Sequence, residues 1–162
     1  MISAAPAGAK NAPFPPPAAG KGTEPTAGSG VGGGISFRPR DAIATYDGVH
    51  YVIYLTTKPL SCAKTYLAKA PYLTISIVTG SPLVVGALSL QKGDSDFVQV
   101  DFYVSATRYY LVQPGVRLTL TRVTAARNAD WHGRVSVPVT DFEGKTFSFT
   151  GSFAAPWCGR VP

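Results

Sequence analysis

Histidine and cysteine, the side chains on which most metal sites and many catalytic sites depend, are scarce in this chain. Its 162 residues include two of each, namely His50, His132, Cys62 and Cys158. A zinc site needs three or four ligands from histidine, cysteine and carboxylates, and a disulfide would remove both thiols from that supply. The cysteines form no C-x-x-C pair, and no carboxylates have the spacing of an EF-hand loop. We therefore predict no metal and no cofactor.

Recognisable catalytic motifs are also missing. The chain has no G-x-S-x-G nucleophile motif. Gly28, Gly30 and Gly33 have the spacing of a dinucleotide-binding fingerprint, but neither a strand before them nor a helix after them is expected. We predict that the protein is not an enzyme. The alternative is a hydrolase that uses Asp101 or Asp130 with a histidine, because catalytic partners can lie far apart in the sequence.

Charge is sparse and mostly of one sign. Charged residues make up 15% of the chain, against roughly 25% in soluble domains. Lysine and arginine number 15 and aspartate and glutamate 9, so the net charge is +6. The charges are scattered and form no block of like sign, which favours a mildly basic surface without a special role. A polyanion-binding surface for acidic glycans or anionic lipids is the alternative, and we do not expect nucleic acid as a partner.

Long apolar segments are absent. No run reaches the roughly 18 residues that a transmembrane helix needs, and the first residues lack the basic and apolar regions of a signal peptide. Two placements stay open: a cytosolic protein, or an extracytoplasmic one in which Met1 stands after a removed signal. We favour the second because of the tail described next.

The two cysteines allow one intrachain disulfide. In an extracytoplasmic protein this bond is Cys62–Cys158, whereas two buried free thiols would be expected in a cytosolic one. The bond would close a loop of about a hundred residues, which contributes up to about 4.7 kcal/mol in the chain-entropy model.

Proline, alanine and glycine dominate the start of the chain. Residues 1–34 contain a single aromatic side chain, Phe14, and too little apolar surface to offset the entropy of ordering. We predict a disordered tether here, spanning on the order of 30–35 Å, followed by a single domain at 35–162.

The rest of the chain alternates between apolar and polar residues with the period of a β-strand. In the last segment Phe147, Phe149 and Phe153 share one side and serines and threonines the other. Asp47 and Gly48 form a typical two-residue hairpin turn. We expect strands at 42–46, 49–57, 72–79, 83–90, 97–104, 109–112, 116–123, 134–139 and from 145 onward. The segment 83–90 is apolar on both faces, which predicts a central strand, and 124–130 is expected to be a loop. This pattern predicts an all-β fold, an antiparallel β-sandwich of immunoglobulin-like or similar type with about eight or nine strands.

Two short segments place aromatic rings beside cations, as binding surfaces often do. We therefore predict a recognition patch made of Arg108, Tyr109, Tyr110, Trp131, His132 and Arg134. The alternative is that Tyr110 and Trp131 belong to the core or its rim, as large rings usually do.

Residues 52–63 around Cys62, and the ending from Gly151 to Cys158, resemble motifs of uncharacterised secreted or lipid-anchored bacterial β-sandwich proteins. In those proteins a cysteine in mid-chain pairs with one at the C-terminus. The resemblance implies an extracytoplasmic location (periplasmic, surface-anchored or secreted) and no particular activity. We therefore predict a non-enzymatic binding or scaffolding domain at the bacterial cell envelope, with an unknown protein or glycan as its partner; a polyanion- or glycan-binding module is the second possibility.

Overall fold

The computed structural model of the protein describes residues 25–32, 34–80, 83, 85–88, 97–106, 109–112, 115–142 and 145–161. In this part of the chain eleven strands form one sheet, so the predicted all-β class is confirmed. The only helical element among the described residues is the short 3-10 segment η1 (Cys62–Leu67). No helix of these residues has the length and apolarity needed to cross a membrane.

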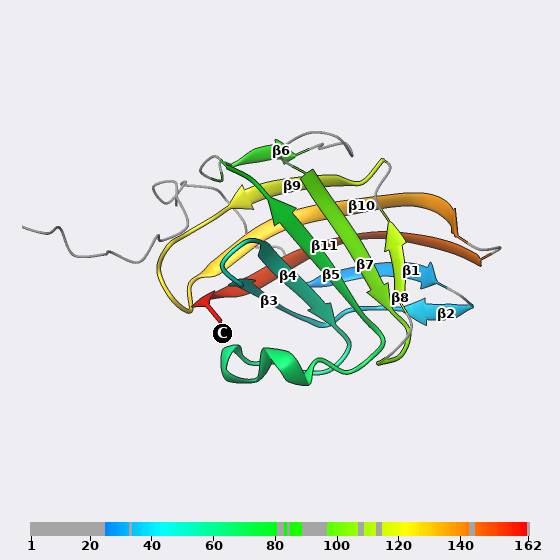
Figure 1. The fold of residues 1–162 in the computed structure, drawn as a ribbon, viewed down its shortest axis with the longest axis horizontal. Coiled ribbons are helices and arrows are strands. Elements are labelled where there is room, and N and C mark those ends of the chain that lie inside the picture. The colour runs from blue at the N-terminus through cyan, green and yellow to red at the C-terminus, as the bar shows by residue number, and fades with distance from the viewer. Residues whose placement is uncertain are drawn as a thin grey trace, which may run out of the picture.

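The sheet has two arms that curl toward one another. Strands run in the order β6-β9-β10-β11-β3-β4-β5-β7-β8. Outside this order, β1 pairs with β11, and β2 pairs with β1. The rear arm comprises β1 (Ala27–Gly32), β2 (Ile35–Phe37), β6 (Gly86–Leu88), β9 (Arg117–Arg122), β10 (Asp130–Phe142) and β11 (Lys145–Arg160). The front arm comprises β3 (Asp41–Tyr46), β4 (Tyr51–Thr56), β5 (Tyr72–Val78), β7 (Phe97–Tyr103) and β8 (Tyr109–Val112). The front arm lies before β9, β10 and β11 and crosses them at a steep angle (Figure 1).

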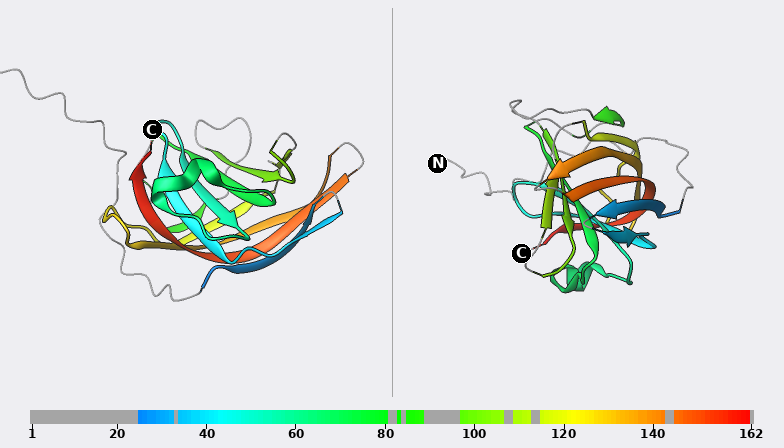
Figure 2. Two further views of the ribbon diagram at one scale, coloured as in Figure 1. Left: turned by 90° about the horizontal axis from the view of Figure 1, so that it is seen from below. Right: turned by 90° about the vertical axis from the view of Figure 1, so that its right-hand side faces the viewer.

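Strand β11 belongs to both arms. Its first half pairs antiparallel with β1, from Ala27 opposite Ser152 to Gly32 opposite Phe147. Its second half pairs in parallel with β3 through Trp157, and the register shifts before Arg160. The left view of Figure 2 shows the long strands β10 and β11 curving along one side of the molecule, with the end of β11 turning up beside β3. The result is a mixed sheet curled into a half-barrel, so the predicted antiparallel sandwich is not confirmed.

Two further expectations about strands require correction. Residues 83–90 were expected to form a central strand, because they are apolar on both faces, but β6 lies at the end of the strand order. Residues 124–130 were expected to be a loop throughout, but β10 already begins at Asp130.

The predicted tether overlaps the folded sheet at its C-terminal end. Residues 27–32 form β1, which lies between β11 and β2; residues 1–24 of the predicted tether lie outside the described residues. Glycine is required in β1 because aromatic rings cover it. A Cβ atom added to Gly32 would lie 2.5 Å from Phe102 Cε1 and 2.6 Å from Phe147 Cδ2. From the sequence alone these glycines indicate a flexible coil. In the structure they allow the backbone of β1 to lie close to the aromatic rings.

The core lies inside the curl and is rich in aromatic side chains. Phe102 of the front arm stacks on Phe147 of the rear arm with ring centroids 4.7 Å apart. Phe37 contacts Phe102 edge-on at 5.2 Å and lies 5.6 Å from Phe149. The predicted inward face of the last strand is confirmed, since Phe147, Phe149 and Phe153 are all buried.

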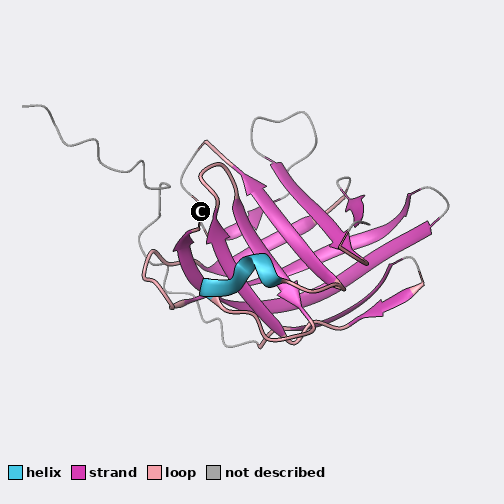
Figure 3. Cartoon of the chain, turned by 60° about the horizontal axis from the view of Figure 1, so that its bottom comes forward, coloured by secondary structure: helices cyan, strands magenta, loops and turns pink. Residues whose placement is uncertain are grey.

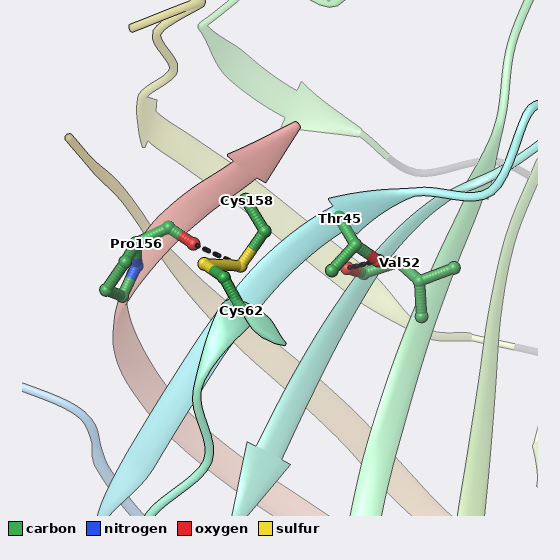
Figure 4. The surroundings of a disulfide bond; sticks show 5 residues. All are labelled: Thr45, Val52, Cys62, Pro156 and Cys158. Atoms are coloured by element: carbon green, nitrogen blue, oxygen red, sulfur yellow. Dashed lines mark hydrogen bonds between the residues drawn. A yellow bond between two sulfur atoms is a disulfide. The ribbon is translucent and has the colours of Figure 1, made fainter. Parts of the chain in front are cut away.

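A disulfide joins Cys62 to Cys158, as predicted, across a sequence separation of 96 residues and with the Cα atoms 5.1 Å apart. It fastens η1, which lies along one end of the front arm, to the end of β11 (Figures 3 and 4). Cys158 Sγ also contacts the carbonyl oxygen of Pro156 at 3.7 Å. The C-terminal segment is further held where Val161 N donates to the carbonyl oxygen of Tyr46 at 2.9 Å.

Removing the disulfide will destabilise the fold substantially. We expect the Cys62→Ser, Cys158→Ser double variant to lose about 3–5 kcal/mol of unfolding free energy in urea titrations, because a long loop is released in the unfolded chain. Wild-type protein with reductant should approach the variant, and the variant itself should not respond to reductant. A loss below about 1 kcal/mol would contradict the structural role given to this bond.

Filling the space at Gly32 will also destabilise the protein. We expect Gly32→Ala to lower the unfolding free energy by about 1–3 kcal/mol, the usual consequence of overpacking a core. Gly80 is the matched control, because no atom of the described residues lies within 4 Å of a Cβ atom added there. Gly80→Ala should change stability by no more than about 0.5 kcal/mol; equal effects at both positions would show that the rings do not limit β1.

Candidate functional site

Two of the six predicted recognition residues, Trp131 and His132, are buried and do not contribute to an exposed patch. Trp131 is fully buried and stacks on Trp157 with centroids 4.7 Å apart, and its indole nitrogen donates to the carbonyl oxygen of Thr124 at 2.8 Å. This ring therefore lies in the core, in keeping with the alternative interpretation of its position. His132, its neighbour, is buried as well, and its Nδ1 atom has no hydrogen-bond partner in the part of the chain that the structure describes.

The other predicted residues lie on different elements. Tyr109 and Tyr110 belong to β8 of the front arm, and the structure describes only their backbone. Arg108 lies outside the described residues. Arg134 is exposed on β10 of the rear arm. Of the six residues, Arg134 is the one whose described side chain is exposed to solvent.

Arg134 lies in a hollow of about 450 Å³ on the outer face of the rear arm. We call this hollow the arginine groove. It is lined by Arg117 and Thr119 of β9, Arg134, Val135 and Ser136 of β10, and Thr150, Gly151 and Ser152 of β11. Sequence reasoning missed Arg117, because its proximity to Arg134 depends on how β9 and β10 are aligned.

The strand register explains why these side chains gather. Arg134 lies opposite Thr119 on one side and opposite Ser152 on the other, and Ser136 lies opposite Arg117. Alternate residues of the same strands point into the core, so the polar set is directed to the outer face. Arg117 and Arg134 are therefore diagonal neighbours, with Cα atoms about 7–8 Å apart by standard sheet geometry.

The groove offers hydrogen-bond donors and positive charge. Two guanidinium groups and four hydroxyl groups line it, and no carboxylate is among the described residues that do so. Guanidinium groups bind carboxylate, sulfate and phosphate oxygens in a bidentate manner, and hydroxyls donate to the same oxygens. The arrangement is suited to binding an anion that extends across three strands.

One histidine does contact a carboxylate, but in a hairpin turn. Asp47 accepts hydrogen bonds from the backbone of Val49 (2.8 Å) and His50 (2.7 Å) and from His50 Nδ1 (2.9 Å). Partial burial raises the pKa of Asp47, but the hydrogen bonds from His50 and Val49 outweigh it and hold the pKa below its usual value. Both side chains are exposed, and the pair stabilises the loop 47–50, which joins β3 to β4 with four residues where a two-residue Asp47–Gly48 turn was expected. The pair does not line the arginine groove.

Asp101 is a buried carboxylate on the outer face of the front arm. It accepts hydrogen bonds from Gln99 Nε2 at 2.9 and 3.2 Å. Burial raises its pKa, and the Gln99 hydrogen bond only partly opposes this effect. Nearby, Tyr72 stacks on Tyr103 with centroids 4.5 Å apart. Burial together with Tyr103 raises the pKa of Tyr72 to about 12.

Metal binding finds no support in the described residues, which contain no group of three or more histidine, cysteine, aspartate or glutamate side chains able to hold an ion. Searches of protein-family models, of curated proteins and of solved structures found no match to this chain. The site must therefore be interpreted from its own geometry.

The pKa shifts of the two aspartates predict opposite pH effects. Because the folded pKa of Asp101 is raised, its ionisation costs stability above that pKa, and the cost disappears as the pH falls toward the unfolded value of about 3.9. Asp101→Asn, which can still accept from Gln99, should therefore raise the melting temperature near pH 7, and the gain should shrink toward pH 4.

Asp47→Asn is the control of opposite sign. The folded pKa of Asp47 is lowered, so its contribution to stability is present above the unfolded pKa and is lost as the pH falls through the folded one. This variant should melt below wild type near pH 7 and approach it in acid. Parallel melting curves of the two variants across the pH range would contradict both assignments.

Proposed function

We propose that the protein is a non-enzymatic binding domain of the bacterial cell envelope, and that it binds an anionic glycan in the arginine groove. The observation that carries this proposal is the convergence of Arg117, Arg134 and four hydroxyl groups on one hollow without a lining carboxylate in the described part of the chain. The strands that present these groups are anchored in the core, so the donors are held in place before the ligand arrives.

A glycan is favoured over other polyanions because of what lines the groove. Proteins that bind single-stranded nucleic acid stack the bases on aromatic side chains, whereas the described lining residues of the groove are arginine, serine, threonine, valine and glycine. Serine and threonine hydroxyls can both donate to and accept from sugar hydroxyls. The two guanidinium groups would bind the carboxylate or sulfate groups of an acidic sugar chain.

An extracytoplasmic location is supported by two features. The Cys62–Cys158 disulfide is the kind of bond that persists in oxidising compartments. The proline-, alanine- and glycine-rich start of the chain is typical of a segment that holds a domain away from its attachment point. The proposal expects a lipid anchor or a cleaved signal peptide, and the first codons of the full gene would test this expectation.

Neutralising the groove should weaken binding of acidic polysaccharides. We expect the Arg117→Gln, Arg134→Gln double variant to bind heparin and alginate about tenfold less tightly than wild type and to elute from heparin at lower salt, since two charge-assisted contacts are lost. Affinity is measured by calorimetry at two salt concentrations.

Arg127→Gln is the matched control, because Arg127 is exposed on the β9–β10 loop and does not line the groove. It should reduce affinity only slightly, through net charge. If Arg127→Gln weakens binding as much as the double variant does, the interaction depends on overall charge and the groove is not the site.

A further inference from the structure

A second hollow, formed by residues 56–69, is suited to a different anion. Its volume is about 360 Å³, and we call it the lysine pocket. It is lined by Thr56, Lys58, Pro59, Leu60, Ser61, Lys64, Ala68 and Lys69. We propose that the lysine pocket binds a small molecule carrying a phosphate or sulfate group.

The charge distribution supports this assignment. Lys58, Lys64 and Lys69 are the charged residues that line the pocket, and all three are exposed. None of them forms an ion pair with a carboxylate of the described residues. Three ammonium groups around one hollow repel one another, and a bound dianion would relieve that repulsion.

A carboxylate that contacts this loop is already engaged with the backbone. Asp41 accepts from Ala42 N at 3.0 Å through one oxygen and from Leu60 N at 2.7 Å through the other. It therefore fixes the position of the loop that carries the lysines and is not paired with them.

The wall of the pocket is held from several sides. Arg40 N donates a hydrogen bond to the carbonyl oxygen of Thr56 at 2.9 Å. The Thr56 hydroxyl donates to the carbonyl oxygen of Lys58 at 2.7 Å. Lys64 N donates to the carbonyl oxygen of Ser61 at 2.9 Å. Cys62, which lies between Ser61 and Lys64, is bonded to Cys158 on β11. A loop fixed in this way loses little conformational freedom when a ligand binds.

The chemistry of the lining limits the ligand. The ammonium groups are donors without acceptor capacity, and lysine recognises phosphate as a point charge. The volume lies at the lower end of the range for small-molecule sites, so a compact ligand fits better than a polymer. The lysine pocket belongs to the β4–η1 connection and the arginine groove to β9, β10 and β11, so the two sites can be tested separately.

Inorganic phosphate and sulfate are the probes. We expect saturable binding to the full chain by calorimetry, weakening with added sodium chloride. Each of the single variants Lys58→Gln, Lys64→Gln and Lys69→Gln should lower the affinity about two- to fivefold, and the triple variant should abolish it. The single variants decide the matter if the triple variant fails to fold.

Two controls locate the effect. Arg127→Gln removes one positive charge elsewhere and should leave phosphate binding within about twofold of wild type, as should the Arg117→Gln, Arg134→Gln variant. Opening the disulfide by Cys62→Ser, Cys158→Ser should weaken phosphate binding, because Ser61 and Lys64 lose their anchor.

Three results would overturn the proposal. They are the absence of saturable binding to wild type at tens of millimolar phosphate, affinity unaffected by all three lysine substitutions, or equal losses in the Arg127→Gln control. Phosphate affinity that is unchanged in the disulfide variant would overturn the role given to the anchor.

Discussion

The structure depends on one strand being held along both of its edges. β11 pairs with β10 on one side, and on the other it pairs first with β1 and then, in parallel, with β3. A parallel partner cannot be joined by a tight turn, so this contact joins residues far apart in the chain. Near the parallel pairing, Cys158 forms the bond to Cys62, and Gly159, with φ of +75°, occupies the point where the register shifts. Glycine adopts that backbone conformation at little cost. Without this strand the two arms would have no common edge and the aromatic core would lie open.

The same constraint explains why the polar sites lie where they do. One face of every long strand packs against the core. On the opposite face of the rear arm, serine, threonine and arginine side chains point outward. Since β9, β10 and β11 are fixed in register by the core, the arginine groove needs no loop to close it. The lysine pocket is built differently, from a connection between strands, and it needs the disulfide and Asp41 to hold its wall in place. Rigid strands and a fastened loop thus position two sets of donors by separate means.

Local pattern was sufficient for part of this description. Alternation identified the inward phenylalanines of β11, and the two cysteines allowed only one disulfide. The Asp-Gly dipeptide located the hairpin, but four residues, 47–50, join β3 to β4 in place of the expected two-residue turn. Contacts between segments that are far apart in the chain could not be predicted from local pattern. The glycines of β1 resemble a linker until the rings of Phe102 and Phe147 are placed over Gly32. Trp131 was placed in the recognition patch because the strand was expected to begin at 134. β10 begins at Asp130, so Trp131 and Arg134 are three apart in one strand and point to opposite faces. Arg117 was missed because only the pairing of β9 with β10 brings it near Arg134.

The described linings of the two hollows share the chemistry of anion-binding sites. The described linings of both hollows consist of arginine or lysine with hydroxyl and apolar side chains. The ionisable groups with shifted pKa values lie elsewhere, where Asp47 caps a turn and Asp101 is paired with Gln99. Guanidinium, ammonium and hydroxyl groups that converge on a hollow can each donate a hydrogen bond to a bound anion.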